Sequence, residues 1–318
     1  MRTRQFSFLL IVALLATAAA AAPVSFDAQL EPPAGRVISG WAQFSTGWDL
    51  GQPAGKAEAE NLAAYQKAVA PHPPAMISFE VAADATTLPE FLRRYRELSA
   101  SHGFFVAQIA FNFRGNEHDV AIGMRDPELL TLGDALKEFG RPVFLRIGAQ
   151  FNQPGALYEP SGYIGAFRHG VERLRFNKLN FAAVWSATAQ GFSASQQMKW
   201  YPGDDVVDWW ALDVVDTHDL ALAESKAFVD DAAHHRKPTL INANPRGVKS
   251  EADALKFCVA LFDFVRANPT VKGFTLEAGA RFVRWPKVAA YLKQQLADPR
   301  LIDANQASEV FRPSRSDR

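Results

Sequence analysis

Short apolar segments alternate with amphipathic segments along almost the whole of this 318-residue chain. Segments with the length and apolar content of buried strands lie at residues 37–44, 75–80, 104–111, 142–148, 181–186, 207–214, 238–241 and 271–277. Helical spacing of apolar residues lies at 57–69, 88–102, 128–139, 163–176, 220–235, 251–267 and 288–296, while the connection at 188–203 is polar and loop-like. This alternation predicts a single closed (β/α)8 TIM barrel of the α/β class.

Composition limits the partners that such a barrel would bind. Hydrophobic residues make up 48% of the chain and charged residues 21%, which fits one large globular domain. The 34 basic and 34 acidic residues give a formal net charge of zero, so no overall field attracts nucleic acid or an anionic membrane surface. We expect a monomer without a nucleic-acid partner.

The first residues have the pattern of an export signal. A basic start at Met1 to Arg4 is followed by an apolar run at 6–16 and by small residues at 18–22. We therefore expect a signal peptide at 1–22, the barrel at 23–298, a polar tail at 299–318 that frays, and a secreted or periplasmic protein. No other apolar run reaches the roughly 18 residues of a membrane-spanning helix, so we expect no stable membrane insertion after cleavage.

The single cysteine, Cys258, lies in an amphipathic segment and has no partner for an internal disulfide. Its surroundings lack the positive charge that activates a thiol, so we expect it to be buried. The chain also lacks cysteine pairs and the His-x-x-x-His or Glu-x-x-His spacing of a zinc site. Neither a metal nor another cofactor is predicted.

Active sites in this fold occupy the loops that follow the carboxyl ends of the strands. Aromatic residues are frequent in these loops, and Trp48, Tyr158 and Trp185 are predicted on or near the rim. Sugar rings pack their C–H faces on aromatic planes, and their hydroxyls need fixed polar partners. Polar side chains expected at the strand ends include Asn112, Gln150, Asn152 and Asp213. A mouth of this composition favours a polysaccharide or oligosaccharide as the partner.

Four segments between roughly residues 130 and 245 follow one another in a distinctive order. They are Arg141-Pro-Val-Phe-Leu-Arg-Ile-Gly-Ala-Gln-Phe-Asn-Gln153, the helix start at Tyr158 to Arg168, the strand at Phe181 to Ser186, and the stretch from Trp200 to Asp213. Together they resemble glycoside hydrolase family 26, which includes retaining β-mannanases. The resemblance implies a (β/α)8 barrel, a proton-donating Glu at position 150, a nucleophilic Glu among positions 242–244, and an Arg146 that orients the two carboxylates.

The chain departs from this family at both catalytic positions. Gln150 stands where the acid/base Glu is expected, and an amide cannot donate that proton. The segment from Lys237 to Pro245 offers Asn242, Ala243 and Asn244 in place of the nucleophile. Ala149 stands where mannan-cleaving members often have His. The ligand-binding residues that we expect are Gln150, Asn152, Arg146, Trp185, Tyr158, Trp48, Asn112, Asn242 and Asn244.

The remaining candidates for catalysis are carboxylates at other predicted strand ends, namely Glu80, Asp213 and Glu277. Hydrolysis needs two carboxylates, about 5 to 5.5 Å apart in retaining enzymes and roughly 6.5 to 9.5 Å apart in inverting ones. One interpretation is an active glycosidase that uses these relocated acids. Another is a glycan-binding pseudoenzyme that keeps the groove without the chemistry. Both are secreted carbohydrate-active proteins of the family 26 type.

A third interpretation is a polysaccharide lyase. In such an enzyme Gln150 and Asn152 would bind the carboxylate of a uronic acid, and Tyr158 or His118 would remove a proton. His118 follows an acidic residue in a polar segment, where a solvated side chain is the simpler expectation.

Overall fold

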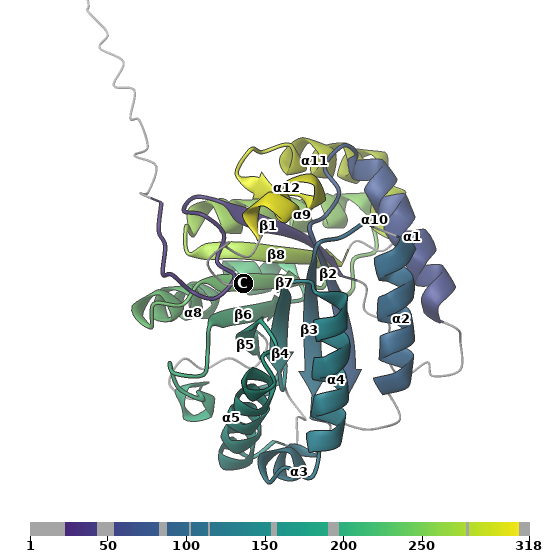
Figure 1. The fold of residues 1–318 in the computed structure, drawn as a ribbon. Coiled ribbons are helices and arrows are strands. Elements are labelled where there is room, and N and C mark those ends of the chain that lie inside the picture. The colour runs from purple at the N-terminus through teal and green to yellow at the C-terminus, as the bar shows by residue number, and fades with distance from the viewer. Residues whose placement is uncertain are drawn as a thin grey trace, which may run out of the picture.

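Eight parallel strands close into a barrel in the computed structural model of this chain (Figure 1). The structure describes residues 23–42, 54–82, 88–101, 103–113, 115–153, 158–189, 197–277 and 280–311. The barrel strands are β1 (Val37–Ala42), β2 (Met76–Ala82), β3 (Val106–Asn112), β4 (Val143–Ile147), β5 (Phe181–Thr188), β6 (Trp209–Val214), β7 (Thr239–Ala243) and β8 (Val271–Glu277). Each strand pairs with the next, and β1 pairs with both β8 and β2, which closes the barrel. The predicted (β/α)8 fold is confirmed.

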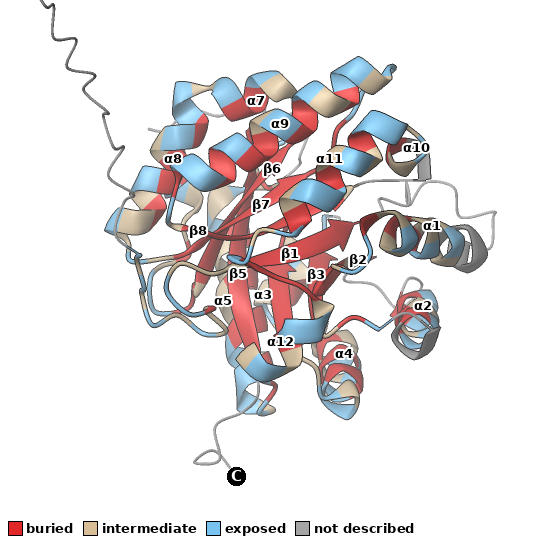
Figure 2. Ribbon diagram, turned by 90° about the horizontal axis from the view of Figure 1, so that it is seen from above, coloured by how far each residue is buried: buried red, intermediate tan, exposed pale blue. Residues whose placement is uncertain are grey.

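Helices follow the strands and cover the outside of the barrel, with their buried faces turned inward (Figure 2). They are α1 (Ala54–Val69), α2 (Leu88–Ser101), α3 (Glu117–Ala121), α4 (Asp126–Phe139), α5 (Pro160–Phe176), the 3-10 helix η1 (Met198–Trp200), α7 (Thr217–Ala221), α8 (Ala223–His234), α9 (Glu251–Ala267), α10 (Ala280–Val283) and α11 (Pro286–Leu296). Cys258 lies on the buried face of α9 as predicted, and burial raises the pKa of its thiol to about 12. Among the described residues, no helix has the length and apolar character needed to cross a membrane.

Side chains alternate between the two faces of each strand, so every second residue points into the barrel. The buried cluster inside the barrel includes Ile38, Met76, Val106, Phe144, Val184, Trp209 and Leu240. Residues between these positions, such as Trp185, Trp210 and Ala243, belong to a larger cluster between the strands and the helices. Trp209 and Trp210 are therefore both core residues, as predicted. The same alternation decides which side chains at the strand ends face the mouth.

Strand and helix bounds follow the sequence pattern closely, with one interruption. The described strand ends lie within two residues of the predicted ones. The helix predicted at 220–235 is broken at Leu222, whose ψ of 137° is extended. A capping box begins α7, in which the side chains of Asp216 and Asp219 each accept a hydrogen bond from the other's backbone N–H. This local capping makes α7 a separate short helix before α8.

A strap formed by residues 23–31 packs across the amino-terminal end of the barrel. Ala28 and Leu30 pack against the inner apolar cluster. Lys272 of β8 is fully buried, and its Nζ lies 3.5 Å from a carboxylate oxygen of Glu31. Burial lowers the pKa of Lys272, an effect that the Glu31 charge opposes. The strap is thus held by one buried ion pair as well as by apolar contacts.

The expectation that residues 299–318 fray is wrong for residues 301–311. There β9 (Leu301–Ile302) pairs with β1, and α12 (Ala304–Val310) packs against the inner cluster through Ala307. The Asp303 carboxylate caps α12 by accepting hydrogen bonds from two backbone N–H groups at 2.9 and 3.1 Å. Two apolar residues suffice to extend the sheet, and the polar composition around them hides this. The predicted signal peptide at 1–22 and residues 312–318 lie outside the described residues.

Replacing Lys272 by methionine should lower the free energy of unfolding by about 3 to 5 kcal/mol, because the Glu31 carboxylate would stay buried without its cation. Urea denaturation measures this loss. The double variant Lys272→Met/Glu31→Gln should recover much of it, since no buried charge is left. Lys256→Met on the exposed face of α9 is the matched control, with an expected change within about 0.5 kcal/mol. An equal loss in the single and double variants would show that the unpaired Glu31 charge does not cause the loss of stability.

Candidate functional site

At the carboxyl end of the barrel, Arg146 of β4 and Asp213 of β6 form a buried ion pair. Nη2 of Arg146 lies 2.5 Å from both carboxylate oxygens of Asp213. The same guanidinium donates to the hydroxyl of Ser186 on β5, from Nε at 3.0 Å and from Nη2 at 2.8 Å. Both charged side chains are only 4% exposed. Asp213 is therefore the acid that pairs with Arg146.

Gln150 reaches the same carboxylate from a strained turn at the end of β4. Its Nε2 donates to Oδ2 of Asp213 at 2.7 Å, and its backbone N–H donates to the carbonyl O of Ser186 at 3.0 Å. Gln150 has a φ of +60° and Gly148 a φ of +59°, in the left-handed region that side chains avoid. A Cβ on Gly148 would lie 2.5 Å from Phe113, so glycine is needed there for space as well. Strain of this kind concentrates at functional sites.

Asn242 of β7 binds Asp213 from the opposite side. Its Nδ2 donates to Oδ1 of Asp213 at 2.9 Å. Its Oδ1 accepts from Nε2 of Gln108 at 2.8 Å and from the Thr275 hydroxyl at 3.1 Å. The Ser78 hydroxyl donates in turn to Gln108 at 2.8 Å. We call this connected set the polar floor; its members are Ser78, Gln108, Arg146, Gln150, Ser186, Asp213, Asn242 and Thr275.

The polar floor joins side chains from seven strands, and sequence reasoning missed half of it. Ser78, Gln108, Ser186 and Thr275 lie within mainly apolar strands and are flanked on both sides by apolar residues. Each points into the barrel, as Arg146 and Asp213 do. The two-residue period of a strand could have indicated this once Arg146 and Asp213 were assigned to the inward face. All four are tied to other members of the set, so the floor presents a rigid surface to the mouth.

The strand alternation separates the three candidate nucleophile positions. Asn242 faces inward and is used by the polar floor, whereas Ala243 is 1% exposed and faces the helices. Asn244 follows on the inward side and is 9% exposed. Within the described residues its side-chain amide forms no hydrogen bond, and its polar atoms are not sealed from solvent. Asn244, and not Ala243, therefore occupies the position from which a side chain would face the mouth.

Glu80 and Glu277 lie on the inward faces of β2 and β8, the two strands that flank β1. Glu277 pairs in register with Ala42 of β1, and Ala42 pairs in turn with Ser78 of β2, so Glu80 lies two residues farther toward the mouth. Both carboxylates are partly exposed. Nδ2 of Asn112 on β3 donates to Oε1 of Glu80.

Two residues expected to contact the ligand form contacts within the protein. Asn152 donates to the carbonyl O of Thr188 at 2.9 Å and accepts from its backbone N–H at 2.8 Å, so both ends of the amide fix the turn to β5. Trp185 is fully buried on the outward face of β5 and stacks on Phe151 at a centroid distance of 5.1 Å. The expectation that Trp185 lies on the rim is wrong, because the neighbouring Ser186 takes the inward position.

The remaining predicted residues lie away from the polar floor or cannot be placed. Tyr158 is partly exposed and packs edge-on against Phe113, 5.9 Å away, as part of an aromatic cluster. His118 is exposed on the short helix α3, in agreement with a solvated side chain. Trp48 lies outside the described residues.

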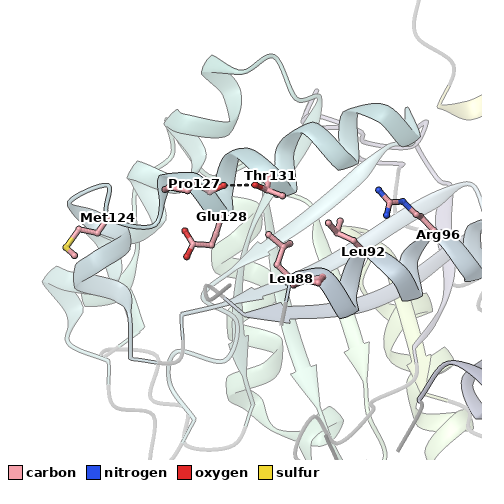
Figure 3. A pocket seen from close by; sticks show the side chains of 8 residues that line it. Leu88, Leu92, Arg96, Met124, Pro127, Glu128 and Thr131 are labelled. Carbon is pink, nitrogen blue, oxygen red and sulfur yellow. Dashed lines mark hydrogen bonds between the residues drawn. The ribbon is translucent and has the colours of Figure 1, made fainter. Parts of the chain in front are cut away.

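A groove of about 560 Å³ lies between helices α2 and α4, outside the barrel (Figure 3). Its lining residues are Leu88, Pro89, Leu92, Arg96, Met124, Pro127, Glu128 and Thr131. None of these is aromatic, so the groove lacks the flat surfaces on which sugar rings pack. It is also separated from the polar floor by the strands, and we do not include it in the candidate site.

Replacing Gln150 by glutamate should make stability depend on pH. The new carboxylate would face Asp213 at the place of the amide nitrogen, and repulsion between like charges should raise the pKa of the new group in the folded state. The variant then keeps its stability at pH values below the pKa of glutamate in the unfolded chain, near pH 4. It loses stability as the pH rises through the higher pKa of the folded state. We expect about 1 to 3 kcal/mol less stability than the native protein at pH 8 and little difference at pH 4. Urea denaturation across this range measures it, and Gln150→Met should show a difference that is independent of pH. A loss in Gln150→Glu that is equal at pH 4 and pH 8 would contradict the contact with Asp213.

The chain is a (β/α)8 barrel, and its fold is similar to the folds of solved glycoside hydrolases. No family model matches the chain. Over 137 residues, or 42% of the chain, it is 31% identical to a β-1,3-xylanase from a Vibrio species, and this match spans 30% of that relative's length. The structure is similar to a GH26 β-mannanase from Bacteroides ovatus, with a TM-score of 0.61 and 15% identity over 88% of this chain and 94% of that one.

A second solved structure, GH26C from a Muricauda species, is similar to the same degree. Its TM-score is also 0.61, with 14% identity over 89% of this chain and 90% of that one. The predicted resemblance to glycoside hydrolase family 26 is therefore confirmed at the level of the fold.

Proposed function

We propose that this chain is a secreted protein that binds a polysaccharide at the barrel mouth and has lost the hydrolytic chemistry of its relatives. One observation carries the proposal: the amides of Gln150 and Asn242, from β4 and β7, both donate to the carboxylate of Asp213. In the related family these two strands supply the pair of catalytic carboxylates. Here they supply hydrogen-bond donors to a third, buried carboxylate.

Asp213 is a poor substitute for either missing acid. Its two oxygens together accept from the Arg146 guanidinium, from Gln150 and from Asn242, and its side chain is 4% exposed. A nucleophile must approach the sugar closely, and a general acid must carry a proton to the leaving oxygen. A carboxylate held by three donors below the mouth does neither.

The class of ligand comes from the relatives and from the sequence. A β-1,3-xylanase and a β-mannanase act on neutral polysaccharides, and we extend this class to the present chain as a proposal. The basic, apolar and small residues at 1–22 support export. An exported protein would encounter polysaccharides outside the cytoplasm.

Binding and turnover should be measured on the same preparation. Isothermal titration with β-1,3-xylotetraose and β-1,4-mannotetraose should detect binding, whereas a reducing-end assay on β-1,3-xylan and β-mannan should detect no release. Hydrolysis that follows the protein through successive purification steps would refute the loss of chemistry. Absence of binding to any glycan would refute the proposal as a whole.

An active glycosidase is the second candidate, and the inward placement of Glu80 and Glu277 on either side of β1 favours it. If the native protein cleaves a glycan, Glu80→Gln and Glu277→Gln should each lower kcat by about 100-fold or more while leaving the fold intact. Glu138→Gln on the exposed face of α4 is the matched control and should leave kcat unchanged. Full activity in both site variants would exclude this pair.

A further inference from the structure

We propose that the groove between α2 and α4 binds a free fatty acid, with the carboxylate of the ligand on Arg96 and its alkyl chain along the apolar residues of the two helices. This site lies outside the barrel and does not depend on the glycan-binding function proposed above. Three observations carry it. The facing sides of the helices leave a space open, most side chains around that space are apolar, and the cation at one end pairs with no acid among the described residues.

The groove exists because the facing sides of the two helices do not fill the space between them. On α4 the lining residues Pro127, Glu128 and Thr131 are about one turn apart and share one side of the helix. None of the three has a long apolar side chain. On α2 the lining residues Leu88 and Leu92 share one side in the same way. The space of about 560 Å³ that remains is within the range of about 300 to 1,000 Å³ for small-molecule sites.

Apolar side chains form most of the lining. They are Leu88, Pro89, Leu92, Met124 and Pro127. Met124 is 65% exposed and Leu92 is half-buried, so apolar surface faces solvent inside the groove. Removing such surface from water favours association with an apolar ligand. An alkyl chain is flexible and needs no aromatic plane to pack on, so it suits a lining without aromatic residues.

The cation of the groove is Arg96, which lies at the opposite end from Met124 (Figure 3). Its guanidinium carbon lies 5.9 Å from the centre of the Phe139 ring, and within the described part of the chain it forms no ion pair. Arg93, about one turn earlier, pairs with two acids of α2 at 2.5 and 2.6 Å. A guanidinium can donate two parallel hydrogen bonds to one carboxylate. The charge of Arg96 therefore favours an anionic group at this end.

The acidic side chain of the groove sets the direction of the ligand. Glu128 lies at the start of α4, near Met124, and its side chain is 15% exposed (Figure 3). Arg125 lies 3.4 Å from Glu128 and also pairs with a second acid, in α3, at 3.1 Å. This end therefore has no spare positive charge for a carboxylate. The eight residues from Leu88 to Arg96 span about 12 Å along α2, so the alkyl chain has room to extend from Arg96 toward Met124.

The test varies the length and the charge of the ligand. Native protein is titrated calorimetrically at pH 7 with octanoate, decanoate, dodecanoate and dodecyltrimethylammonium, each below its critical micelle concentration. We expect the affinity to rise about 5- to 15-fold for each two methylene groups added to the carboxylate. Dodecanoate should bind about tenfold or more tighter than dodecyltrimethylammonium. Equal binding of the cationic ligand would overturn the contact with Arg96, and failure of every carboxylate to bind would overturn the site without affecting the proposed glycan binding.

Variants test the two ends of the groove. Arg96→Met should weaken dodecanoate binding about tenfold or more, whereas Lys137→Met removes an equal charge from the exposed face of α4 and should bind like the native protein. Met124→Glu should weaken dodecanoate binding about fivefold or more, because it places a charge beside the alkyl chain. Ile122→Glu, on the same turn but outside the lining, is its control. Both site residues are exposed, so the variants should fold, and native affinity in either one would overturn the assignment.

A second copy of the chain and a lipid surface are the other occupants to be distinguished. Sedimentation equilibrium should show no self-association that Met124→Glu abolishes, and native protein should not co-sediment with phosphatidylglycerol vesicles. Either behaviour in a protein that fails to bind dodecanoate would overturn the assignment of the groove to a free fatty acid.

Discussion

Replacing Arg146 by methionine should cost about 3 to 5 kcal/mol of stability, because the Asp213 carboxylate would remain buried without its cation. Natural domains are stable by only about 5 to 15 kcal/mol in total, so this variant should lose a large fraction of its stability. The loss arises from the two shortest contacts of the polar floor, both at 2.5 Å. Urea denaturation at 25 °C measures it.

The double variant Arg146→Met/Asp213→Asn separates charge from packing. It removes both charges and keeps a carbonyl oxygen for the amides of Gln150 and Asn242, so it should regain most of the lost stability. If Arg146→Met alone stays within 1 kcal/mol of the native protein, the buried carboxylate does not depend on its guanidinium, and the polar floor is less tightly coupled than its geometry indicates.

The double variant Gln150→Glu/Asn244→Glu should gain hydrolysis of β-1,3-xylan or β-mannan, at least about tenfold above the native background in a reducing-end assay. It restores carboxylates at inward-facing positions of β4 and β7, the strands that carry the catalytic pair in the related family. Repulsion from Asp213 should raise the pKa of the glutamate at position 150, as a general acid requires. The residual rate should therefore fall as the pH rises above neutrality.

A second double variant, Gln150→Glu/Ala243→Glu, is the matched comparison. Counting along the Lys-Pro motif of β7 makes position 243 an equally good candidate, but this side chain is buried between strands and helices. A glutamate there should destabilise the protein and leave it inactive. Activity in this variant, with none in the Asn244→Glu pair, would show that the inward face of β7 has been assigned wrongly.

The sequence predicts the barrel well because its fold depends on a pattern that every segment repeats. Strand ends are correct within two residues, and β8 is predicted without error, since apolar strands and amphipathic helices differ in period. Two features were missed: the break at Leu222 in the helical layer and the added strand β9 in the tail. Each depends on one or two residues. Such short signals are lost when composition is averaged over a segment.

The candidate site could be predicted only in part. Arg146, Gln150, Asp213 and Asn242 are recognisable from the family resemblance, but their partners depend on which face of each strand is turned inward. Between the pairs Thr239–Val271 and Leu240–Gly273 the register shifts by one residue of β8, which interrupts the alternation of β8 before Thr275, and no local sequence signal marks this shift. Trp185 shows the same difficulty. Trp185 and Ser186 are neighbours in β5, and the sequence alone does not show which of the two side chains points into the barrel.

Both described ends of the chain lie at the amino-terminal end of the barrel, opposite the mouth. The strap at 23–31 and the helix α12 pack on the same inner cluster from that side. A tether joined at either described end, such as an affinity tag or a surface linker, would leave the barrel from the face opposite the mouth. The molecule can therefore be anchored at either described end with its mouth turned outward.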